Sequence, residues 1–408
     1  MKRPALATKA LPYAALLPPL LLSPLLLVSN LGAAQTPRGN IGFDAMYFAE
    51  QPLLPDQSGQ SVQPGLSGDL DWSTDLSDDI RVDLGTRLHI TPDAENEVTG
   101  DVKEAVFLTR VKAFDIKLGV LQENWRVLEA WSPVDLVNQR DMVEDFRGKV
   151  KLGQPGVSVN TFYNDVVFTA LALPYTRERR IADGSDRLRT LPAPLLDSTF
   201  ENGQSDIGFA LRLQYRIGDF DLGLSRYQGH TREPLYQPVF QNSTLSGFNE
   251  RYEDIAQTGL ELQYVVGDTV LKAEVIYQSG ATDSFVGSGI GSETTFNQIG
   301  NGFDSITVYA EGYYDTRNDA APLTPFQRDV FVGLRYNTND VNDSLLDLRY
   351  THDFEFDSDL IELRASRRLG SSHTLSAQIL LPLSVSEDPA LRGFKQDKYF
   401  QLSWVWYW

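Results

Sequence analysis

The sequence contains no cysteine and only four histidines among its 408 residues. Disulfides, thiol chemistry and cysteine-based metal sites are therefore excluded, and no cofactor or metal is expected. Lysine and arginine are outnumbered by aspartate and glutamate, 36 to 55, and the net charge of −19 argues against a nucleic-acid partner. Beyond residue 34, no apolar run approaches the roughly 18 residues that a membrane helix needs. If the mature chain enters a membrane, it must do so as a closed β-barrel.

The first 34 residues have the order of a secretory signal peptide. Basic residues at positions 2, 3 and 9 precede an apolar stretch from Leu11 to Leu31, which ends in small residues. Four prolines within this stretch disfavour a membrane-anchor helix, since each removes a backbone donor. We therefore expect export through the periplasm, cleavage after Ala34 and a mature domain over residues 35–408.

The mature sequence alternates between apolar and polar residues over most of its length. In the run from Ile80 to Ile90, IRVDLGTRLHI, every second residue is apolar or threonine, and the intervening residues are mostly charged. Residues 207–224 and 260–277 each contain two such runs, which a glycine-aspartate pair joins as a tight turn. A period of two is typical of strands whose two faces meet different environments.

Long polar segments alternate with these tight turns. They cover residues 91–103, 122–155, 174–205, 229–254, 279–293, 315–328 and 382–396. One rim of tight turns and one rim of long loops is typical of bacterial outer-membrane barrels, whose strand number is even. The sequence therefore predicts an all-β fold, a transmembrane antiparallel β-barrel of about 16–18 strands. Residues 41–48 are expected to form the first strand, and a strand at 294–300 is assigned because an even number requires one there.

The chain ends on an aromatic strand. Trp408 shares one face with Phe400, Leu402, Trp404 and Trp406, while polar residues occupy part of the other face. This pattern looks like the C-terminal strand that the barrel-assembly machinery recognises in outer-membrane barrels, and tryptophan is favoured at the lipid interface. The expected location is the outer membrane of a Gram-negative bacterium, with outer-membrane lipid and the assembly machinery as partners.

In such a barrel the apolar faces contact lipid, so the polar faces must line the lumen. We expect charges of both signs inside the barrel, with pairs such as Arg81 with Asp71 or Lys272 with Glu261 across neighbouring strands. The strand residues predicted to line the pore are Arg81, Asp83, Arg87, Arg212, Arg216, Lys272 and Glu274.

Residues 123–155 are too long and too apolar to form a solvated loop. Side chains such as Trp125, Leu128 and Trp131 need burial, which they would gain by folding into the barrel. An inward-folded constriction segment is therefore predicted, with an extracellular cap as the alternative. The charged residues expected to project from this segment into the bore are Arg126, Asp135, Arg140 and Asp141.

Within this segment, residues 130–141, AWSPVDLVNQRD, are similar to the W-G-x-x-D-x-x-x-P-x-D-x-x-N-P-R-D stretch of an uncharacterised family of proteobacterial outer-membrane proteins. Gln139 stands where that family usually has proline, and Trp125-Arg126 replaces its Trp-Gly pair. Residues 331–350, FVGLRYNTNDVNDSLLDLRY, and 360–370, LIELRASRRLG, resemble the C-terminal half of the family. The resemblance implies a porin-like outer-membrane barrel and no particular substrate. The matching motif residues are Pro133, Asp135, Asn138, Arg140 and Asp141.

The function that these features predict is a porin-like channel for small solutes and not an enzyme, because a charged lumen with an inward segment can select solutes without a reactive residue. The first alternative is a surface receptor or structural barrel with a plugged lumen. In that reading, an anion such as lipopolysaccharide phosphate would bind the basic loop cluster Tyr175, Arg177, Arg179, Arg180, Arg187 and Arg189.

The second alternative is a lipid-active enzyme at the rim of the barrel. His89 or His352 would then be the catalytic base, since each lies near the end of a predicted strand and close to an aspartate. The sequence lacks a G-x-S-x-G elbow, which disfavours this alternative.

Overall fold

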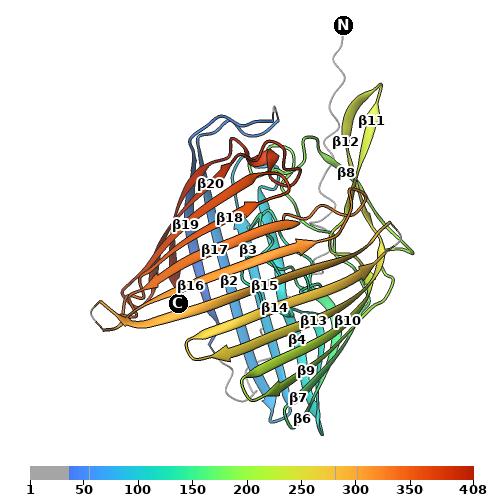
Figure 1. Ribbon diagram of the computed structural model, residues 1–408, viewed down its shortest axis with the longest axis vertical. Helices are drawn as coiled ribbons and strands as arrows, with labels where there is room; N and C mark the ends of the chain where they lie inside the picture. The colour runs from blue at the N-terminus through green and yellow to red at the C-terminus, as the bar shows by residue number, and fades with distance from the viewer. Residues whose placement is uncertain (1–35, 55, 281, 301) are drawn as a thin grey trace.

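The computed structural model describes residues 36–408 except for residues 55, 281 and 301, so the predicted signal peptide lies outside the described residues. Within the described residues, 18 strands form one sheet. Its first strand, β1 (Arg38–Phe48), pairs antiparallel with both β2 (Val62–Ser77) and the last strand, β21 (Tyr399–Tyr407). The sheet therefore closes on itself as a barrel (Figure 1).

The remaining strands of the barrel are antiparallel to their neighbours and follow the chain order. They are β3 (Ile80–Ile90), β4 (Val98–Val111), β5 (Phe114–Leu121), β6 (Gln154–Tyr163), β7 (Val166–Leu173), β9 (Gly208–Ile217), β10 (Phe220–His230), β13 (Asp254–Val266), β14 (Thr269–Ser279), β15 (Ser284–Ile299), β16 (Asp304–Asp315), β17 (Arg328–Asn337), β18 (Leu345–Asp353), β19 (Ser358–Leu369) and β20 (His373–Leu383).

Three further strands belong to the long connections and form a separate small sheet that rises beyond the barrel in Figure 1. These strands are β8 (Leu195–Phe200), β11 (Leu235–Gln241) and β12 (Thr244–Tyr252). One short helical turn, η3 (Arg392–Phe394), lies between β20 and β21. Among the described residues, no helix is long and apolar enough to cross a membrane.

Tight turns join the strands at one rim. The turns between β9 and β10 and between β13 and β14 begin with Gly218 and Gly267, each at φ of 59°. Glycine adopts this left-handed conformation without the steric cost that a Cβ would add, which allows a two-residue hairpin. The opposite rim carries the long connections, although residues 354–357 form a short turn there between β18 and β19.

The barrel is apolar on the outside and ionic on the inside. On β13, Leu260 is 53% exposed while its neighbour Glu261 is 3% exposed, and on β14 Val275 is 41% exposed while Glu274 is completely buried. A water-soluble domain has the opposite distribution, since it buries leucine and valine and exposes glutamate. The predicted all-β barrel and the upper end of its predicted strand number are therefore confirmed.

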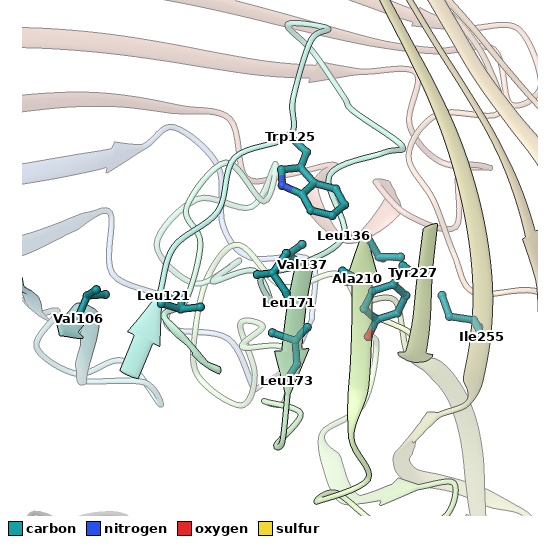
Figure 2. Close-up of a cluster of buried hydrophobic side chains, with 10 residues drawn as sticks. All are labelled: Val106, Leu121, Trp125, Leu136, Val137, Leu171, Leu173, Ala210, Tyr227 and Ile255. Atoms are coloured by element: carbon teal, nitrogen blue, oxygen red, sulfur yellow. The ribbon is translucent and has the colours of Figure 1, made fainter. Parts of the chain in front are cut away.

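One cluster of buried apolar residues lies inside the barrel, where the connection between β5 and β6 folds inward as the sequence predicted. We call this connection, residues 122–153, the inward segment. Figure 2 shows its Trp125, Leu136 and Val137 beside side chains of the barrel wall. Those wall residues come from six strands and comprise Val106, Leu121, Leu171, Leu173, Ala210, Tyr227 and Ile255. The segment gains through these contacts the burial that its composition demands.

The predicted loop at residues 279–293 is wrong, because most of it belongs to β15 (Ser284–Ile299). The strand that was expected at residues 294–300 from the even strand number is the second half of β15. The wrong loop prediction is explained by the glycines of residues 284–291, SFVGSGIG, because glycine is frequent in loops. On β15, Gly289 leaves room for the inward segment, because a Cβ there would lie 2.5 Å from a methyl carbon of Leu128 and 2.8 Å from the ring of Tyr313. Close approach of another chain segment is a recognised reason for glycine within a strand.

Candidate functional site in the barrel lumen

The inward segment is held against the barrel wall by Glu274 of β14. One carboxylate oxygen accepts the main-chain N–H groups of Val127 and Leu128, at 2.7 and 3.0 Å. The hydroxyl of Ser132 lies within 3.0 Å of both carboxylate oxygens. Charge-assisted hydrogen bonds of this kind are roughly twice as strong as neutral ones. Glu274, predicted to line the pore, thus contacts the segment.

A second carboxylate on the same part of the wall repeats this arrangement. Glu311 of β16 accepts the main-chain N–H groups of Glu129 and Ala130, at 2.6 and 2.8 Å. The hydroxyl of Tyr313 accepts the N–H of Trp131 at 3.1 Å. The indole ring of Trp131 also meets the Tyr313 ring edge-on, with 6.0 Å between the ring centroids. The beginning of the segment is therefore fixed by hydrogen bonds and by aromatic packing.

The later part of the segment carries charged side chains toward β18 and β19. Arg147 forms ion pairs with Asp145, at 2.6 Å, and with Glu362 of β19. Lys149 lies 3.5 Å from Glu129, within the same segment. Burial, followed by repulsion from Arg349, lowers the pKa of Lys149 to about 7, although the nearby Glu129 carboxylate opposes the shift. The charge of this amine therefore changes near neutral pH.

A large cavity, with a volume of about 710 Å³, lies between the inward segment and the wall formed by β1–β3 and β17–β21. Its lining reaches from Asn96 and Asp186, in the long connections, to Leu345 and Val405, near the tight-turn rim. The cavity thus extends lengthwise through the barrel. Its charged lining includes Asp69, Arg87, Glu144, Asp145, Arg147, Asp347, Arg349 and Arg364.

A second opening of about 410 Å³ lies near the tight-turn rim, on the other side of the lumen. Arg212 and Arg216, both predicted to line the pore, contribute to its lining. Arg212 pairs with Glu261 of β13 and stacks on the Trp125 ring at 5.4 Å, whereas Arg216 forms an exposed pair with Asp221 at 2.6 Å. Arg212 therefore supports the inward segment, and Arg216 is open to solvent.

Three further predicted residues lie on β3. Arg87 lines the large cavity and pairs with Asp69 at 3.1 Å. Arg81 pairs with Asp83 on its own strand at 2.7 Å, and its side chain is 47% exposed. The expected pair between Arg81 and Asp71 is wrong, because the strand register places Asp75 opposite Arg81.

Lys272 of β14 pairs with Glu293 of β15, at 2.6 Å. The expected pair with Glu261 is wrong, because the register places Gln263 opposite Lys272. Glu261 lies opposite Glu274 instead. The sequence pattern could identify the inner face of each strand, but it could not fix which residues stand opposite each other.

The charged residues predicted to project from the inward segment into the bore make contacts within the segment and with a neighbouring connection. Asp135 binds Lys151 at 2.6 Å, and Asp141 binds Arg180 at 2.5 Å. Arg140 donates to the main-chain carbonyl of Asp135 at 3.1 Å. None of Asp135, Arg140 and Asp141 is part of the lining of the large cavity. The Nε of Arg126 donates to the carbonyl of Leu128 at 2.7 Å, within the segment itself.

Sequence reasoning missed the charged residues of the segment that line the cavity, which are Glu144, Asp145 and Arg147. The carboxylate of Glu144 lies 2.8 Å from Nδ1 of His89 on β3. The other ring nitrogen of His89 lies 3.6 Å from Asp44 of β1, so the histidine stands between two carboxylates. The strand alternation had already placed His89 on the polar face, but nothing in the sequence pointed to Glu144 as its partner.

The predicted basic cluster that would bind a surface anion included Arg187 and Arg189. This prediction is wrong for both residues, because they are only 2% and 0% exposed. Arg187 forms a buried ion pair with Asp397 at 2.7 Å. Arg189 donates to the main-chain carbonyls of Leu191 and Gly184, at 3.0 and 2.6 Å. These side chains hold the long connections together and are not available to a lipid phosphate.

The closed sheet, its apolar outer face and its charged lumen define a porin-like fold. The structure resembles a BenF-like porin from Pseudomonas fluorescens Pf-5, with a TM-score of 0.51, 10% sequence identity, and coverage of 92% of this chain and 98% of that one. It also resembles OccK9 (OpdG) of Pseudomonas aeruginosa, with a TM-score of 0.51, 12% identity, and coverage of 91% and 97%. At these identities the likeness concerns the fold alone.

The sequence matches no known family model and no curated protein. The resemblance of residues 130–141 to one outer-membrane family therefore has no support from these sequence comparisons and stays a prediction.

Proposed function

We propose that this protein is an outer-membrane channel through which small polar solutes pass. The observation that carries the proposal is the cavity of about 710 Å³ that extends lengthwise beside the inward segment. Its walls are charged, and the opposite faces of the same strands are apolar. A charged aqueous passage enclosed by an apolar outer surface is what a polar solute needs in order to cross a lipid layer.

The inward segment is the constriction in this proposal, since it occupies the part of the lumen that the cavity leaves. A passing solute would meet charges of both signs in the cavity lining. The positive charges include Arg87, Arg147 and Arg349, and the negative ones include Asp69 and Glu144. Such an arrangement orients polar molecules and favours those whose charges match the field. We assign Arg126, Asp135, Arg140 and Asp141 to bracing the constriction.

The apolar outer face is the surface that we propose to contact outer-membrane lipid. Phe400, Leu402, Trp404, Trp406 and Trp408 are all more than a third exposed on or next to β21. Aromatic residues are favoured at the level of the lipid headgroups. The same terminal strand is our candidate for recognition by the barrel-assembly machinery during export.

Conductance in planar lipid bilayers tests this function. The purified, refolded protein is expected to insert and to give stepwise currents in potassium chloride. A barrel that inserts, as judged by its protection from protease in vesicles, but never conducts would contradict the channel and favour the receptor with a plugged lumen.

A further inference from the structure

A smaller cavity of about 130 Å³ adjoins the large one on the long-connection side of the inward segment. The two cavities share Phe146, Arg147 and Arg349 in their linings, so they are direct neighbours. Most of the small cavity is apolar. Its apolar lining comes from the segment, from three connections and from the wall, and includes Phe146, Ile181, Leu323, Phe331, Leu360 and Leu391.

One carboxylate in this apolar pocket has no partner. Asp329, at the beginning of β17, is 4% exposed. The main-chain N–H groups of Gln327 and Arg328 lie near it, but neither carboxylate oxygen has a hydrogen bond of acceptable geometry. A buried, unpartnered carboxylate is costly, so its retention needs an explanation.

A second carboxylate stands beside it. Asp353 of β18 is the register partner of Asp329 and is 3% exposed. One of its oxygens accepts the main-chain N–H groups of Glu355 and Phe356, at 2.6 and 3.2 Å, while the other oxygen has no partner. Asp388, in the connection that follows β20, lies nearby and accepts a hydrogen bond from Ser358 at 2.9 Å. The end of the pocket between β17 and β18 therefore carries carboxyl oxygens that lack hydrogen-bond partners.

The cations that line the same pocket do not neutralise this pair. Arg147 is bound to Glu362, and Arg349 is bound to Asp347 at 2.7 Å. Lys149 pairs with Glu129 of its own segment. Among the described residues, neither Lys149 nor Arg179 forms an ion pair with Asp329 or Asp353. The unpartnered oxygens of Asp329 and Asp353 are therefore left for a hydrogen-bond donor on an occupant of the pocket.

The geometry points to an organic ammonium compound with an apolar body as the occupant, and this inference rests on the proposed channel function, for which it names a class of solute. The described residues form no cluster of carboxylates and histidines that could hold a metal ion. The pocket is close in volume to the apolar cavity of about 150 Å³ that accepts benzene in another protein. The pocket lining includes the aromatic side chains of Phe146, Phe326 and Phe331, against which an apolar body can pack.

Equilibrium binding of three probes of equal shape tests this inference. Benzylammonium, benzyl alcohol and benzoate are titrated into the detergent-folded barrel by calorimetry. Benzylammonium is expected to bind at least about ten-fold more tightly than benzyl alcohol, because a hydrogen bond to a charged group contributes more than one to a neutral group. Benzoate is expected to bind more weakly than either. Equal binding of benzylammonium and benzyl alcohol would overturn the inference.

Substitution locates the site. Asp329→Asn preserves the shape of the side chain and is expected to weaken benzylammonium binding about ten-fold while leaving benzyl alcohol unchanged. Asp319→Asn, at an exposed position in the connection before β17, is the matched control and is expected to bind like wild type. If Asp329→Asn does not fold, Asp353→Asn takes its place. Wild-type affinity in the folded pocket variant would contradict the assignment.

Potassium chloride conductance, recorded on the same preparation, separates this inference from the proposed function. A barrel that conducts but does not prefer benzylammonium keeps the channel and loses the pocket assignment. A barrel that binds benzylammonium through Asp329 but never conducts keeps the pocket and loses the channel.

Discussion

The carboxylate of Glu274 accepts a hydrogen bond from the main-chain N–H of Val127, with 2.7 Å between oxygen and nitrogen. Val127 belongs to the inward segment, which leaves the wall at β5 and returns at β6, whereas Glu274 stands on β14. The bond thus joins the segment to a distant part of the barrel. Together with Glu311 of β16, this buried side chain holds the inward segment against the wall.

Glu274→Gln is expected to loosen the inward segment. The substitution places an amide NH₂ group where main-chain N–H donors now meet a carboxylate, at a cost of about 1–3 kcal/mol. Limited proteolysis of the folded barrel should then cut within residues 122–153 faster than in the wild type. Glu293→Gln is the control, since that carboxylate contacts Lys272 on the wall. Equal cleavage of the two variants would count against an anchoring role for Glu274.

Gly289 of β15 tests whether the segment presses against the wall. Alanine at this position would bring a Cβ to 2.5 Å from Leu128, so either the segment or the strand must shift. Overpacking of this kind costs about 1–3 kcal/mol. Thermal unfolding followed on gels that separate folded from denatured barrel should show a lower midpoint. Gly312→Ala, where no atom lies within 4 Å of the added Cβ, is expected to unfold like wild type.

Asp397→Asn is expected to open the long connections at the outer end of the barrel. Arg187 and Asp397 form an ion pair at 2.7 Å with side chains 2% and 0% exposed, so the substitution leaves a buried guanidinium without its counter-charge. Breaking such a pair costs about 3–5 kcal/mol. Faster proteolysis of residues 174–207 would report the change. Lys398→Gln breaks the neighbouring ion pair with Glu50, which is partly exposed, and the rate of proteolysis is expected to stay at the wild-type value.

The pKa of Lys149, lowered to about 7 by burial, predicts a pH-dependent ion selectivity. Below pH 7 the amine is charged and adds a positive charge to the small cavity that adjoins the passage, and above pH 7 it is neutral. The reversal potential in a salt gradient should therefore move toward cation selectivity between about pH 6 and pH 8. Lys149→Met should reduce this shift. The same shift in both proteins would show that other groups cause it.

Much of the fold could be predicted because a strand with two different faces leaves a period of two in the sequence. Leu260 and Glu261 show this, one on the lipid-type face and one in the lumen. The first half of β15 escaped prediction because its inner face uses Gly287, Gly289 and Gly291, which suit close approach and also suit loops.

The site was harder to predict than the fold. Apolar content and length identified the inward segment, because Trp125 and Trp131 had to be buried. The charges beside them could not be sorted into bracing and lining residues, since that depends on how the segment lies on the wall. Asp135 turned toward Lys151, while Glu144 reached His89 on a distant strand.

Deletion of the inward segment is the most direct test of the proposed constriction, and the strand register makes this deletion possible. Leu121 and Gln154 are register partners at the ends of β5 and β6, so an Asn-Gly turn can replace residues 122–153 without disturbing the pairing. Single-channel conductance in potassium chloride is then compared between this variant and wild type. The account predicts stepwise currents from both proteins, with a several-fold larger step for the variant. Equal steps, or no current from either correctly inserted barrel, would contradict it.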